Sequence, residues 1–300
     1  MIFMTTVLHL EAVSRRFGER QVLQDVTFDV VAGRMTGFVG ANGAGKTTTM
    51  RIILGVLAAD AGTVTWQGTP LTRAVRRGFG YMPEERGLYP KMTVRDQLIY
   101  LSRLHGLGPG TAKRNAEALI ERLSLGERAG DPLENLSLGN QQRAQIAAAL
   151  VHEPEVLVLD EPFSGLDPLA VDTVVAVLRE RTARGVPVLF SSHQLDVVER
   201  LCDDLVIIAG GQIRAAGPRQ HLRESYAQPR YTLHVDGDAG WLRDELGVSL
   251  VDLDGPRAVF DLAGDADDQT ILRNALSRGP VRSFGPVTPS LAEIFREVTR

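Results

Sequence analysis

Residues 40–47, Gly-Ala-Asn-Gly-Ala-Gly-Lys-Thr, have the residue types and spacing for phosphate chemistry, matching G-x-x-x-x-G-K-[ST] in full. Glycines let backbone N–H groups curl around phosphate oxygens that side chains would keep away. Lys46 would reach the β- and γ-phosphates, Thr47 would ligate Mg²⁺, and a following helix would add partial positive charge. The alternative is an ordinary glycine-rich turn, but the full match favours a nucleotide site. We predict that ATP is bound by Gly40, Asn42, Gly43, Ala44, Gly45, Lys46, Thr47 and Thr48.

An apolar run that ends in two carboxylates lies further along the chain. Residues 156–159 read Val-Leu-Val-Leu and are followed by Asp160 and Glu161. This pattern predicts a buried strand that can place Asp160 near the metal and Glu161 near an attacking water, which Glu161 would polarise as the base. Alternatively, the two carboxylates could simply be solvated at the end of a strand, or Glu161 could support the site without acting as the base. Together with the phosphate loop, the pair indicates nucleotide hydrolysis.

Further segments resemble motifs of the ATP-binding-cassette (ABC) ATPases, and they follow the family's order. Leu136–Arg143, Leu-Ser-Leu-Gly-Asn-Gln-Gln-Arg, resembles the signature usually written L-S-G-G-Q, and Ser164–Asp167 is similar to the D-loop. Gly80–Glu84 resembles the Q-loop, and Ser191–His193 resembles the switch histidine that follows a strand. Phe17-Gly18 lies where the family stacks an aromatic ring on adenine. The resemblance covers about residues 7–220.

This resemblance implies a P-loop NTPase fold and a head-to-tail dimer of cassettes. ATP would lie between the phosphate loop of one subunit and Ser137 and Gly139 of the other. Ser137 precedes an apolar helix, and a helix N-terminus suits a γ-phosphate, although the hydroxyl could simply cap its own helix. The family's pattern also implies that Phe17 stacks on adenine and that His193 contacts the γ-phosphate and orients the water. A core position for Phe17 and an ordinary surface or core position for His193 are the alternatives.

Three positions depart from the family's usual residues. Glu84 stands where Gln is most frequent, and a carboxylate there would bind Mg²⁺ or its water more strongly while repelling the γ-phosphate. In the signature, Leu138 replaces the first Gly and Asn140 replaces Gln. Glu85–Pro90 resembles a branch of exporters that includes sodium and drug extrusion systems, in which Glu is usual at position 84, and Pro289–Phe295 resembles that branch's C-terminal segment. The resulting metal ligands are Thr47, Glu84 and Asp160.

Hydrophobic periodicity indicates an α/β fold around these motifs. Apolar residues alternate at Leu8, Leu10 and Ala12, which predicts a half-buried strand, and strands alternating with helices later in the chain imply a mainly parallel sheet. We expect an ATP-binding domain over residues 1–225, with an inserted helical subdomain at about 90–150, and a small α+β domain over 226–300. Expected strands are 26–30, the segment from Met35, 156–160, 186–191, 205–209, 248–253 and 258–262; expected helices are 46–57, 94–104, 112–123, 136–151, 169–182, 268–277 and 291–298.

Residues outside the motifs receive simpler interpretations. Arg76, Arg77 and Arg86 are typical of a solvated basic face. Cys202 is the single cysteine, and we expect it to be buried on the helix after His193 rather than to act as a nucleophile. One cysteine also excludes an internal disulfide and a cysteine-rich metal cluster, so a reducing compartment is expected.

Composition restricts the classes of protein further. With 44% hydrophobic and 23% charged residues, the chain can bury a sizeable core, which excludes a disordered protein. Its 33 Lys and Arg against 37 Asp and Glu give a formal net charge of −4, which argues against a nucleic-acid partner. No apolar run reaches the ~18 residues of a membrane span, and the N-terminus lacks the features of a secretory signal. We therefore expect a cytoplasmic protein, peripheral on the cytoplasmic face of the cell membrane.

The sequence thus predicts the ATP-hydrolysing subunit of an ABC transporter, an exporter driven by ATP-dependent dimer closure. A permease on a separate chain would be the partner, and the cassettes would form a homo- or heterodimer. The alternatives are a soluble ABC ATPase that acts on DNA or the ribosome, and a regulatory nucleotide-binding module without catalysis. The chain lacks the coiled coils, zinc motifs and tandem cassettes of the former, and the Asp160-Glu161 pair argues against the latter.

Overall fold

The computed structural model describes residues 6–85, 87–264 and 266–299. These residues form two compact units, one that ends at Arg219 and one that runs from Gln220 to Val298. Each unit has a hydrophobic core of its own. The boundary between the two units therefore falls at the start of α8 (Arg219–Ser225), close to the boundary expected at residue 225.

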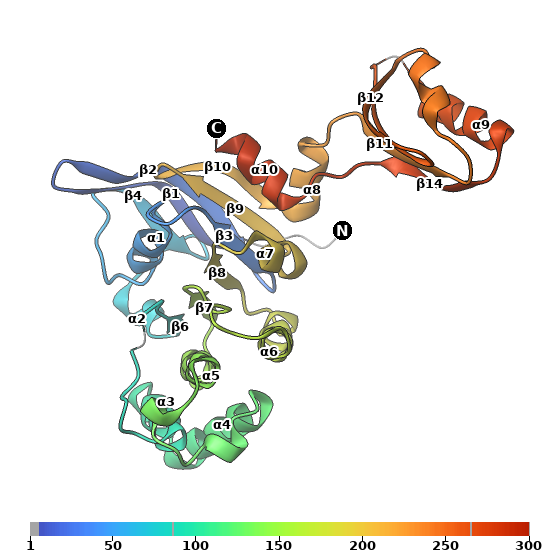
Figure 1. The fold of residues 1–300 in the computed structure, drawn as a ribbon. Helices are drawn as coiled ribbons and strands as arrows, with labels where there is room; N and C mark the ends of the chain where they lie inside the picture. The colour runs from blue at the N-terminus through green and yellow to red at the C-terminus, as the bar shows by residue number, and fades with distance from the viewer. Residues whose placement is uncertain (1–5, 86, 265, 300) are drawn as a thin grey trace. The chain divides into compact units, whose positions relative to one another are not determined.

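A six-stranded sheet organises the first unit (Figure 1). Its strand order is β10-β9-β3-β8-β7-β6, and all neighbouring pairs are parallel except β10 with β9. The parallel strands are almost wholly buried because helices and a second sheet cover them, which explains their continuous apolar sequences. The strands are β3 (Met35–Val39), β6 (Phe79–Met82), β7 (Val156–Leu159), β8 (Val188–Ser192), β9 (Asp204–Ala209) and β10 (Gln212–Pro218).

An antiparallel sheet of order β2-β1-β4-β5 forms a second layer of the first unit. Helix α1 (Lys46–Ile53) is packed between the two sheets, where Met50 and Ile53 join a core with residues from both. The first turn of α1 lies directly after the glycine-rich loop, so this packing also fixes the loop. The antiparallel strands are β1 (Thr6–Phe17), β2 (Arg20–Val31), β4 (Ala61–Trp66) and β5 (Thr69–Pro70).

A β-bulge in β1 makes the prediction of a buried Ala12 wrong. Leu8 and Leu10 are buried as predicted, but Ala12 is exposed and has a positive φ of 49°. The pairing register with β2 shifts between Leu10 and Val13, and Val13 takes the buried position instead. One extra residue reverses the faces of all residues that follow, because side chains alternate along a strand.

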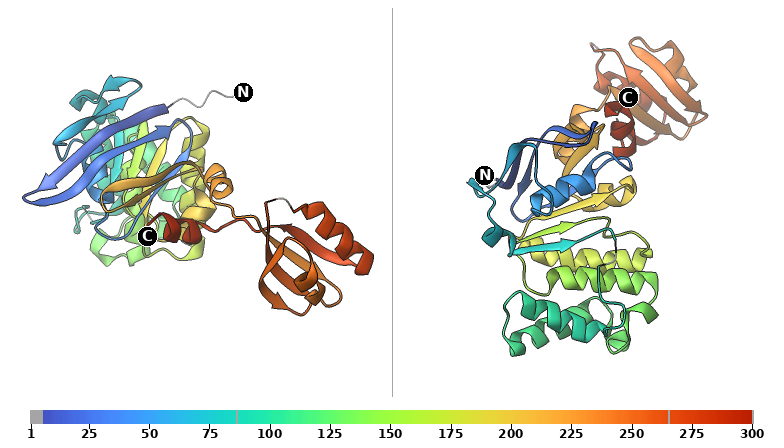
Figure 2. Two further views of the ribbon diagram at one scale, coloured as in Figure 1. Left: turned by 90° about the horizontal axis from the view of Figure 1, so that it is seen from above. Right: turned by 90° about the vertical axis from the view of Figure 1, so that its left-hand side faces the viewer.

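The segment between β6 and β7 is helical, as the sequence predicts. Figures 1 and 2 show α3 and α4 side by side, with α5 between them and the six-stranded sheet. Thr93 and Ser137 cap α3 and α5 by accepting backbone N–H bonds, as short hydroxyl side chains commonly do. The helical elements of the first unit are α2 (Arg73–Arg76), α3 (Val94–Leu104), α4 (Pro109–Arg122), η1 (Gly126–Arg128), η2 (Leu133–Asn135), α5 (Leu138–Leu150), α6 (Pro168–Ala183) and α7 (Leu195–Leu201).

Arg76 is not part of a solvated basic face. Its guanidinium donates hydrogen bonds to the backbone oxygens of Ile53, at 2.9 Å, and Leu71, at 3.0 Å. Burial lowers the pKa of Arg76. The side chain therefore binds the last carbonyl of α1, where a cation is favourable. Arg77 is exposed, and Arg86 lies outside the described residues.

Cys202 is buried, as predicted, but it lies immediately after α7 rather than within it. Desolvation by burial is the largest cause that raises the pKa of its thiol to about 12. The thiol therefore stays protonated at neutral pH, and this is consistent with a packing role rather than a nucleophilic one.

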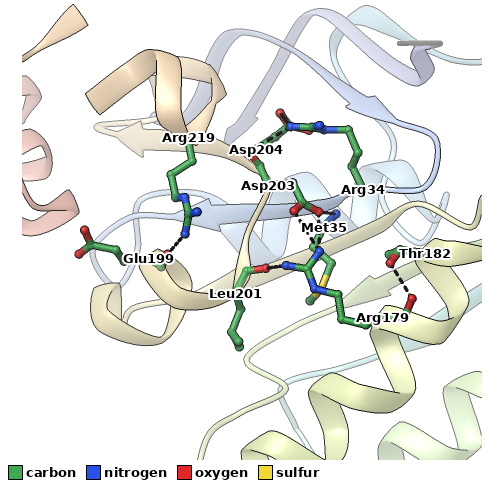
Figure 3. A network of polar contacts seen from close by, with 9 residues as sticks. All are labelled: Arg34, Met35, Arg179, Thr182, Glu199, Leu201, Asp203, Asp204 and Arg219. Atoms are coloured by element: carbon green, nitrogen blue, oxygen red, sulfur yellow. Dashed lines mark hydrogen bonds and ion pairs between the residues drawn. The ribbon is translucent and has the colours of Figure 1, made fainter. Parts of the chain in front are cut away.

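An ionic network fastens the amino-terminal ends of β3 and β9 (Figure 3). Arg34 makes two hydrogen bonds to the carboxylate of Asp204, at 2.5 and 2.7 Å. Asp203 accepts the backbone N–H of Met35 at 2.8 Å and both its oxygens accept from Arg179 of α6. Hydrogen bonding to Asp204 is the largest cause that raises the pKa of Arg34. Every charge in this cluster is paired, so it stabilises the edge opposite the glycine-rich loop.

The second unit contains both strands and helices, in agreement with the small α+β domain expected from the sequence. Its sheet has the order β12-β13-β11-β14, and all neighbouring strands are antiparallel. Ile271 and Ala275 of α9 pack on the sheet face that carries Leu233 and Phe260. The elements after α8 are β11 (Arg230–Val235), η3 (Gly240–Asp244), β12 (Val248–Asp254), β13 (Arg257–Leu262), α9 (Asp268–Arg278), β14 (Val281–Pro286) and α10 (Leu291–Val298).

Candidate nucleotide site

The glycine-rich loop connects β3 to α1 and is closed around its own lysine. Lys46 Nζ donates to the backbone oxygens of Gly40, at 2.7 Å, and Ala41, at 3.3 Å. Gly45 has φ 114°, and a Cβ there would lie 2.5 Å from Leu23 Cδ2, so the loop requires glycine at this position. Ala44 is buried in the core beneath the loop. Gly40 and Ala44 thus pack against the core beneath the loop and support its conformation.

A cleft of about 500 Å³ lies over this loop at the carboxyl edge of the parallel strands. It brings together residues that the sequence analysis selected from distant segments, together with Arg20 and Val22, which it did not select. The charges in the cleft are of both signs, as binding of a phosphate–metal complex requires. The lining residues are Phe17, Arg20, Val22, Asn42, Gly43, Gly45, Lys46, Thr47, Thr48, Glu84, Asp160 and Glu161.

Phe17 lies at the mouth of the cleft, at the end of β1. Its ring is 48% exposed, so a core position is excluded. The guanidinium of Arg15 lies 4.9 Å from the ring centroid, and Arg15 also pairs with Asp60 at 2.6 Å. An exposed, cation-supported aromatic ring beside a phosphate loop can stack on a planar base.

Asp160 follows β7 and is 1% exposed. Its Oδ1 accepts a hydrogen bond from Ser191 Oγ at 2.5 Å, whereas its Oδ2 is buried and has no hydrogen-bond partner among the described residues. Thr47 and Glu84 line the same cleft and add oxygen donors. A buried carboxylate oxygen without a partner, near further oxygen ligands, fits the donor set that Mg²⁺ prefers.

Glu161 has a left-handed backbone conformation, with φ 52°, and its side chain is largely buried. Its Oε1 lies 3.0 Å from Nδ1 of His193, which follows β8. Its backbone N–H donates to Ser191 Oγ at 2.9 Å, and its carbonyl oxygen accepts from Gln142 Nε2 at 3.0 Å. A carboxylate held against an imidazole at the end of a phosphate cleft can polarise a water molecule.

Known proteins share this arrangement of motifs and fold. Residues 23–164 match the family described as ABC transporter, and residues 217–299 match the one described as ATP-binding protein DrrA1-3-like, C-terminal domain. The uncharacterized ABC transporter ATP-binding protein YhaQ of Bacillus subtilis (strain 168) is 38% identical over 97% of this chain and 98% of its own length. The chain belongs to the ABC transporter ATP-binding proteins. It is therefore an ATPase subunit with a P-loop NTPase fold, as the sequence predicted.

Two more matches support this assignment. The Nod factor export ATP-binding protein I of Burkholderia lata is 38% identical to this ABC protein, over 79% of each chain. A solved structure of an ATP-binding subunit of an ABC transporter aligns with a TM-score of 0.69 and 33% identity, over 74% of this chain and 93% of the other. ATP-binding subunits of this family generally pair with separate permeases and act as dimers. No helix in the described part of this ABC protein is long and apolar enough to cross a membrane.

The signature residues of this ABC protein lie at the start of α5. Ser137 Oγ accepts the backbone N–H of Asn140 at 3.3 Å, so the hydroxyl caps its own helix, and Leu138 is exposed. Within the described ranges, neither Ser137 nor Gly139 lines the nucleotide cleft. Leu138 instead borders a smaller hollow of about 210 Å³ together with Glu84, Gln142, Glu161, Ser164, Gly165 and His193.

Sequence reasoning missed several residues around the site of this ABC protein. Arg20 and Val22 follow a turn after Phe17 and carry no motif of their own. Gln142 is inside the signature segment, but its contact with the carbonyl oxygen of Glu161 depends on tertiary structure. Ser191 precedes the selected His193 by two residues, and the signal for it was a polar residue at the end of an apolar strand.

Proposed function

We propose that this chain is the motor subunit of an exporter, in which two cassettes close on ATP and drive a permease on a separate chain. The export function in the name of the Burkholderia relative supports this direction of transport. The cassette would act at the cytoplasmic face of the membrane. The observation that carries the hydrolytic part is the convergence of Lys46, Asp160 and Glu161 on one cleft.

ATP binding rests on the glycine-rich loop and on Phe17. Lys46 Nζ would exchange its two carbonyl partners for phosphate oxygens, which are stronger acceptors because they are charged. Thr48 and the N–H groups around Gly43 and Gly45 would bind further phosphate oxygens at the positive end of α1. Phe17 would stack on adenine.

Mg²⁺ would be held by Thr47, Asp160 and Glu84. Asp160 would contribute Oδ2, the buried atom that lacks a partner in the described part of the chain. When bound, the ion neutralises charge that develops on the transferred phosphate. Glu84 is exposed and borders both hollows, so it can reach the metal from the side of the signature segment.

Hydrolysis requires a base and a means to orient the attacking water. Glu161 would accept the proton of that water, and His193, 3.0 Å from Glu161 Oε1, would hold the carboxylate and contact the γ-phosphate. Ser137 and Gly139 of a second cassette would complete the site. Their exposed helix N-terminus, outside the cleft of their own chain, supports binding to nucleotide on another chain.

Replacement of Glu161 by Gln tests the hydrolytic role. We expect Glu161→Gln to bind ATP with unchanged affinity and to lose at least about 100-fold in turnover, because an amide cannot take the proton. Phosphate release measures turnover, and light scattering with Mg-ATP shows whether the variant accumulates as a dimer. Glu127→Gln, at an exposed residue of η1, is the matched control. Normal turnover in Glu161→Gln would overturn this assignment.

The surface beside the loop from Glu84 to Met92 is the proposed permease contact. The rings of Tyr89 and Tyr100 lie 6.2 Å apart in an edge-to-face arrangement, and both are exposed. Leu104, on α3, is exposed as well and lines a hollow together with Tyr100. This exposed apolar patch follows Glu84 of the nucleotide cleft along the chain, so it suits a partner that must respond to ATP.

Co-purification tests this contact and the class of partner. We expect the cassette to co-purify with a multi-span membrane protein, and the pair to hydrolyse ATP faster than the cassette alone. Leu104→Ser should abolish the stimulation and leave basal turnover unchanged, whereas Leu276→Ser, at an exposed position on α9, should retain both. Co-purification with ribosomes or DNA instead would favour the other class of ABC ATPase.

A further inference from the structure

Ser191 occupies the junction between the two carboxylates of the site. It is the fourth residue of β8 (Val188–Ser192) and is fully buried. Its Oγ donates to Asp160 Oδ1 at 2.5 Å and accepts the backbone N–H of Glu161 at 2.9 Å. One hydroxyl thus binds two consecutive residues at the end of the neighbouring strand.

The surroundings explain why this hydroxyl matters. The preceding residues of β8, Leu189 and Phe190, are fully buried and apolar, so water does not compete for the two hydrogen bonds. A serine hydroxyl has one donor and accepting lone pairs, and both kinds are used here. An alanine would leave the N–H of Glu161 and one oxygen of Asp160 without this partner.

Each hydrogen bond sets the direction of one carboxylate. With Oδ1 bound to Ser191, Asp160 keeps Oδ2 without a hydrogen-bond partner among the described residues, and this is the atom left for a metal. The bond to the N–H of Glu161 supports a left-handed φ of 52°, which a non-glycine residue adopts only when its surroundings hold it there. In that backbone conformation, Oε1 of Glu161 lies 3.0 Å from Nδ1 of His193.

We propose that Ser191 is a positioning residue for hydrolysis: its hydroxyl fixes Asp160 for the metal and Glu161 for the attacking water. This inference rests on the proposed function of Asp160 and Glu161. Ser191 is not among the described residues that line the nucleotide cleft, and it acts through the two carboxylates. Partners of metal ligands typically change metal affinity or activity by about 10- to 100-fold when they are removed.

Ser191→Ala, Ser191→Thr and Ser191→Cys test the proposal. We expect Ser191→Ala to lower kcat by about 10- to 100-fold, with the KM for ATP changed by less than about 3-fold. Ser191→Thr keeps the hydroxyl and should recover most of the kcat. Ser191→Cys introduces a thiol, which is a weak donor, so its kcat should lie between those of the alanine and threonine variants. It replaces the threonine variant if the added methyl group prevents folding.

Thr36→Val is the matched control for loss of a buried hydroxyl from the same sheet. Thr36 lies on β3 beside β8, is fully buried, and its Oγ1 lacks a hydrogen-bond partner in the region that the structure describes. Its removal should leave both kcat and the Mg²⁺ requirement unchanged. An equal loss of kcat in Thr36→Val and Ser191→Ala would indicate a general packing effect and overturn the proposal.

A readout independent of turnover uses the Glu161→Gln background. The rise in Tm caused by ATP is measured while Mg²⁺ is titrated, and Ser191→Ala should raise the half-saturating Mg²⁺ concentration by about 10-fold. Wild-type kcat and Mg²⁺ dependence in Ser191→Ala would overturn the positioning role and leave the proposed function intact. Normal turnover in Glu161→Gln alone would instead overturn the proposed function.

Discussion

Aspartates at the two ends of the parallel strands of the six-stranded sheet differ in how far their carboxylates are paired. At the carboxyl edge, Asp160 leaves Oδ2 buried without a partner in the described chain. At the amino edge, Asp203 and Asp204 have both carboxylates engaged by Arg179 and Arg34. The same residue type is thus fully satisfied at one edge and left incomplete at the other.

This difference separates stability from function. An unpaired buried carboxylate oxygen costs free energy, which the fold tolerates where a ligand can complete the site. Paired carboxylates at the opposite edge hold the starts of β3 and β9 together, and this steadies the strand that leads into the phosphate loop. We therefore expect removal of a carboxylate at the carboxyl edge to lower turnover, and removal of one at the amino edge to lower stability.

Asp160→Asn should cause the largest change. We expect turnover to fall at least about 100-fold, because a neutral amide is a poor ligand for Mg²⁺. Without nucleotide, the free energy of unfolding should rise by about 1 kcal/mol, because a poorly paired buried charge is removed. Phosphate release and urea denaturation measure the two effects. A variant that loses stability as well as turnover would break the contrast between the edges.

Asp203→Ala should show the reverse behaviour. The change leaves the N–H of Met35 without its acceptor, and it leaves Arg179, whose side chain is 41% exposed, without its carboxylate partner. Stability should therefore fall by about 1–2 kcal/mol. Turnover per folded molecule should stay within about 2-fold, because the network is remote from the cleft. Asp172→Ala, which removes an exposed ion pair with Arg200, should cost less than about 1 kcal/mol. Equal losses in the two variants would contradict the assignment of stability to this network.

His152 offers a comparison with Asp160, because it also has a buried atom without a hydrogen-bond partner among the described residues but lies outside the cleft. Its Nδ1 is buried and has no partner in the described ranges, while Nε2 lies 3.2 Å from the backbone oxygen of Phe79, at the start of β6. Desolvation is the largest cause that lowers the pKa of His152 to about 4, and the stacked ring of His105 adds to it. The folded protein therefore keeps this imidazole neutral.

The pH dependence of stability follows from that shift. Between about pH 6.5 and 4 the unfolded chain binds a proton at His152 that the folded chain does not, so stability falls as pH falls and the loss ends below pH 4. We expect this residue to contribute a loss of about 1–3 kcal/mol over that range. His152→Phe should lack that component in urea denaturation at pH 7 and 4.5. An identical pH dependence in wild type and variant would contradict the neutral imidazole.

Cys202, beside Asp203, should give the smallest effect. With its thiol pKa raised to about 12, the unfolded chain releases a proton from about pH 9 upward that the folded chain keeps, so stability falls as pH rises. At pH 10 this component should be about 1 kcal/mol and should be missing from Cys202→Ala. Denaturation at pH 8 and pH 10 measures the difference. A constant difference between the two proteins would show an accessible thiol.

Local patterns in the sequence predicted the fold class and most elements around the site. The glycine-rich run, the apolar strand before Asp160 and the cap at Ser137 depend on neighbouring residues, which a sequence displays directly. The burial of Val13 in place of Ala12 does not, because it depends on where β1 pairs with β2. A bulge is therefore invisible to an alternation pattern.

Tertiary partners account for the remaining differences. Arg76 was expected to lie on a solvated basic face with Arg77 and Arg86, but the fold brings it to the last carbonyl of α1. Ser191 is separated by about thirty residues from the carboxylates that it binds, so its role emerges only when β7 and β8 lie side by side. Single residues that act through distant partners are the part that sequence patterns predict least.

The bulge in β1 also restricts how the chain can vary in length. Phe17 lies four residues beyond Val13 at the end of the same strand, and it lines the cleft. Deletion of Ala12 would remove the register shift between Leu10 and Val13 and change how every later residue of β1 pairs with β2. Gly62 packs against this kink, since a Cβ there would lie 2.4 Å from the oxygen of Ala12. The bulge therefore requires glycine at position 62 on the neighbouring strand β4, where any side chain would collide with the backbone of Ala12.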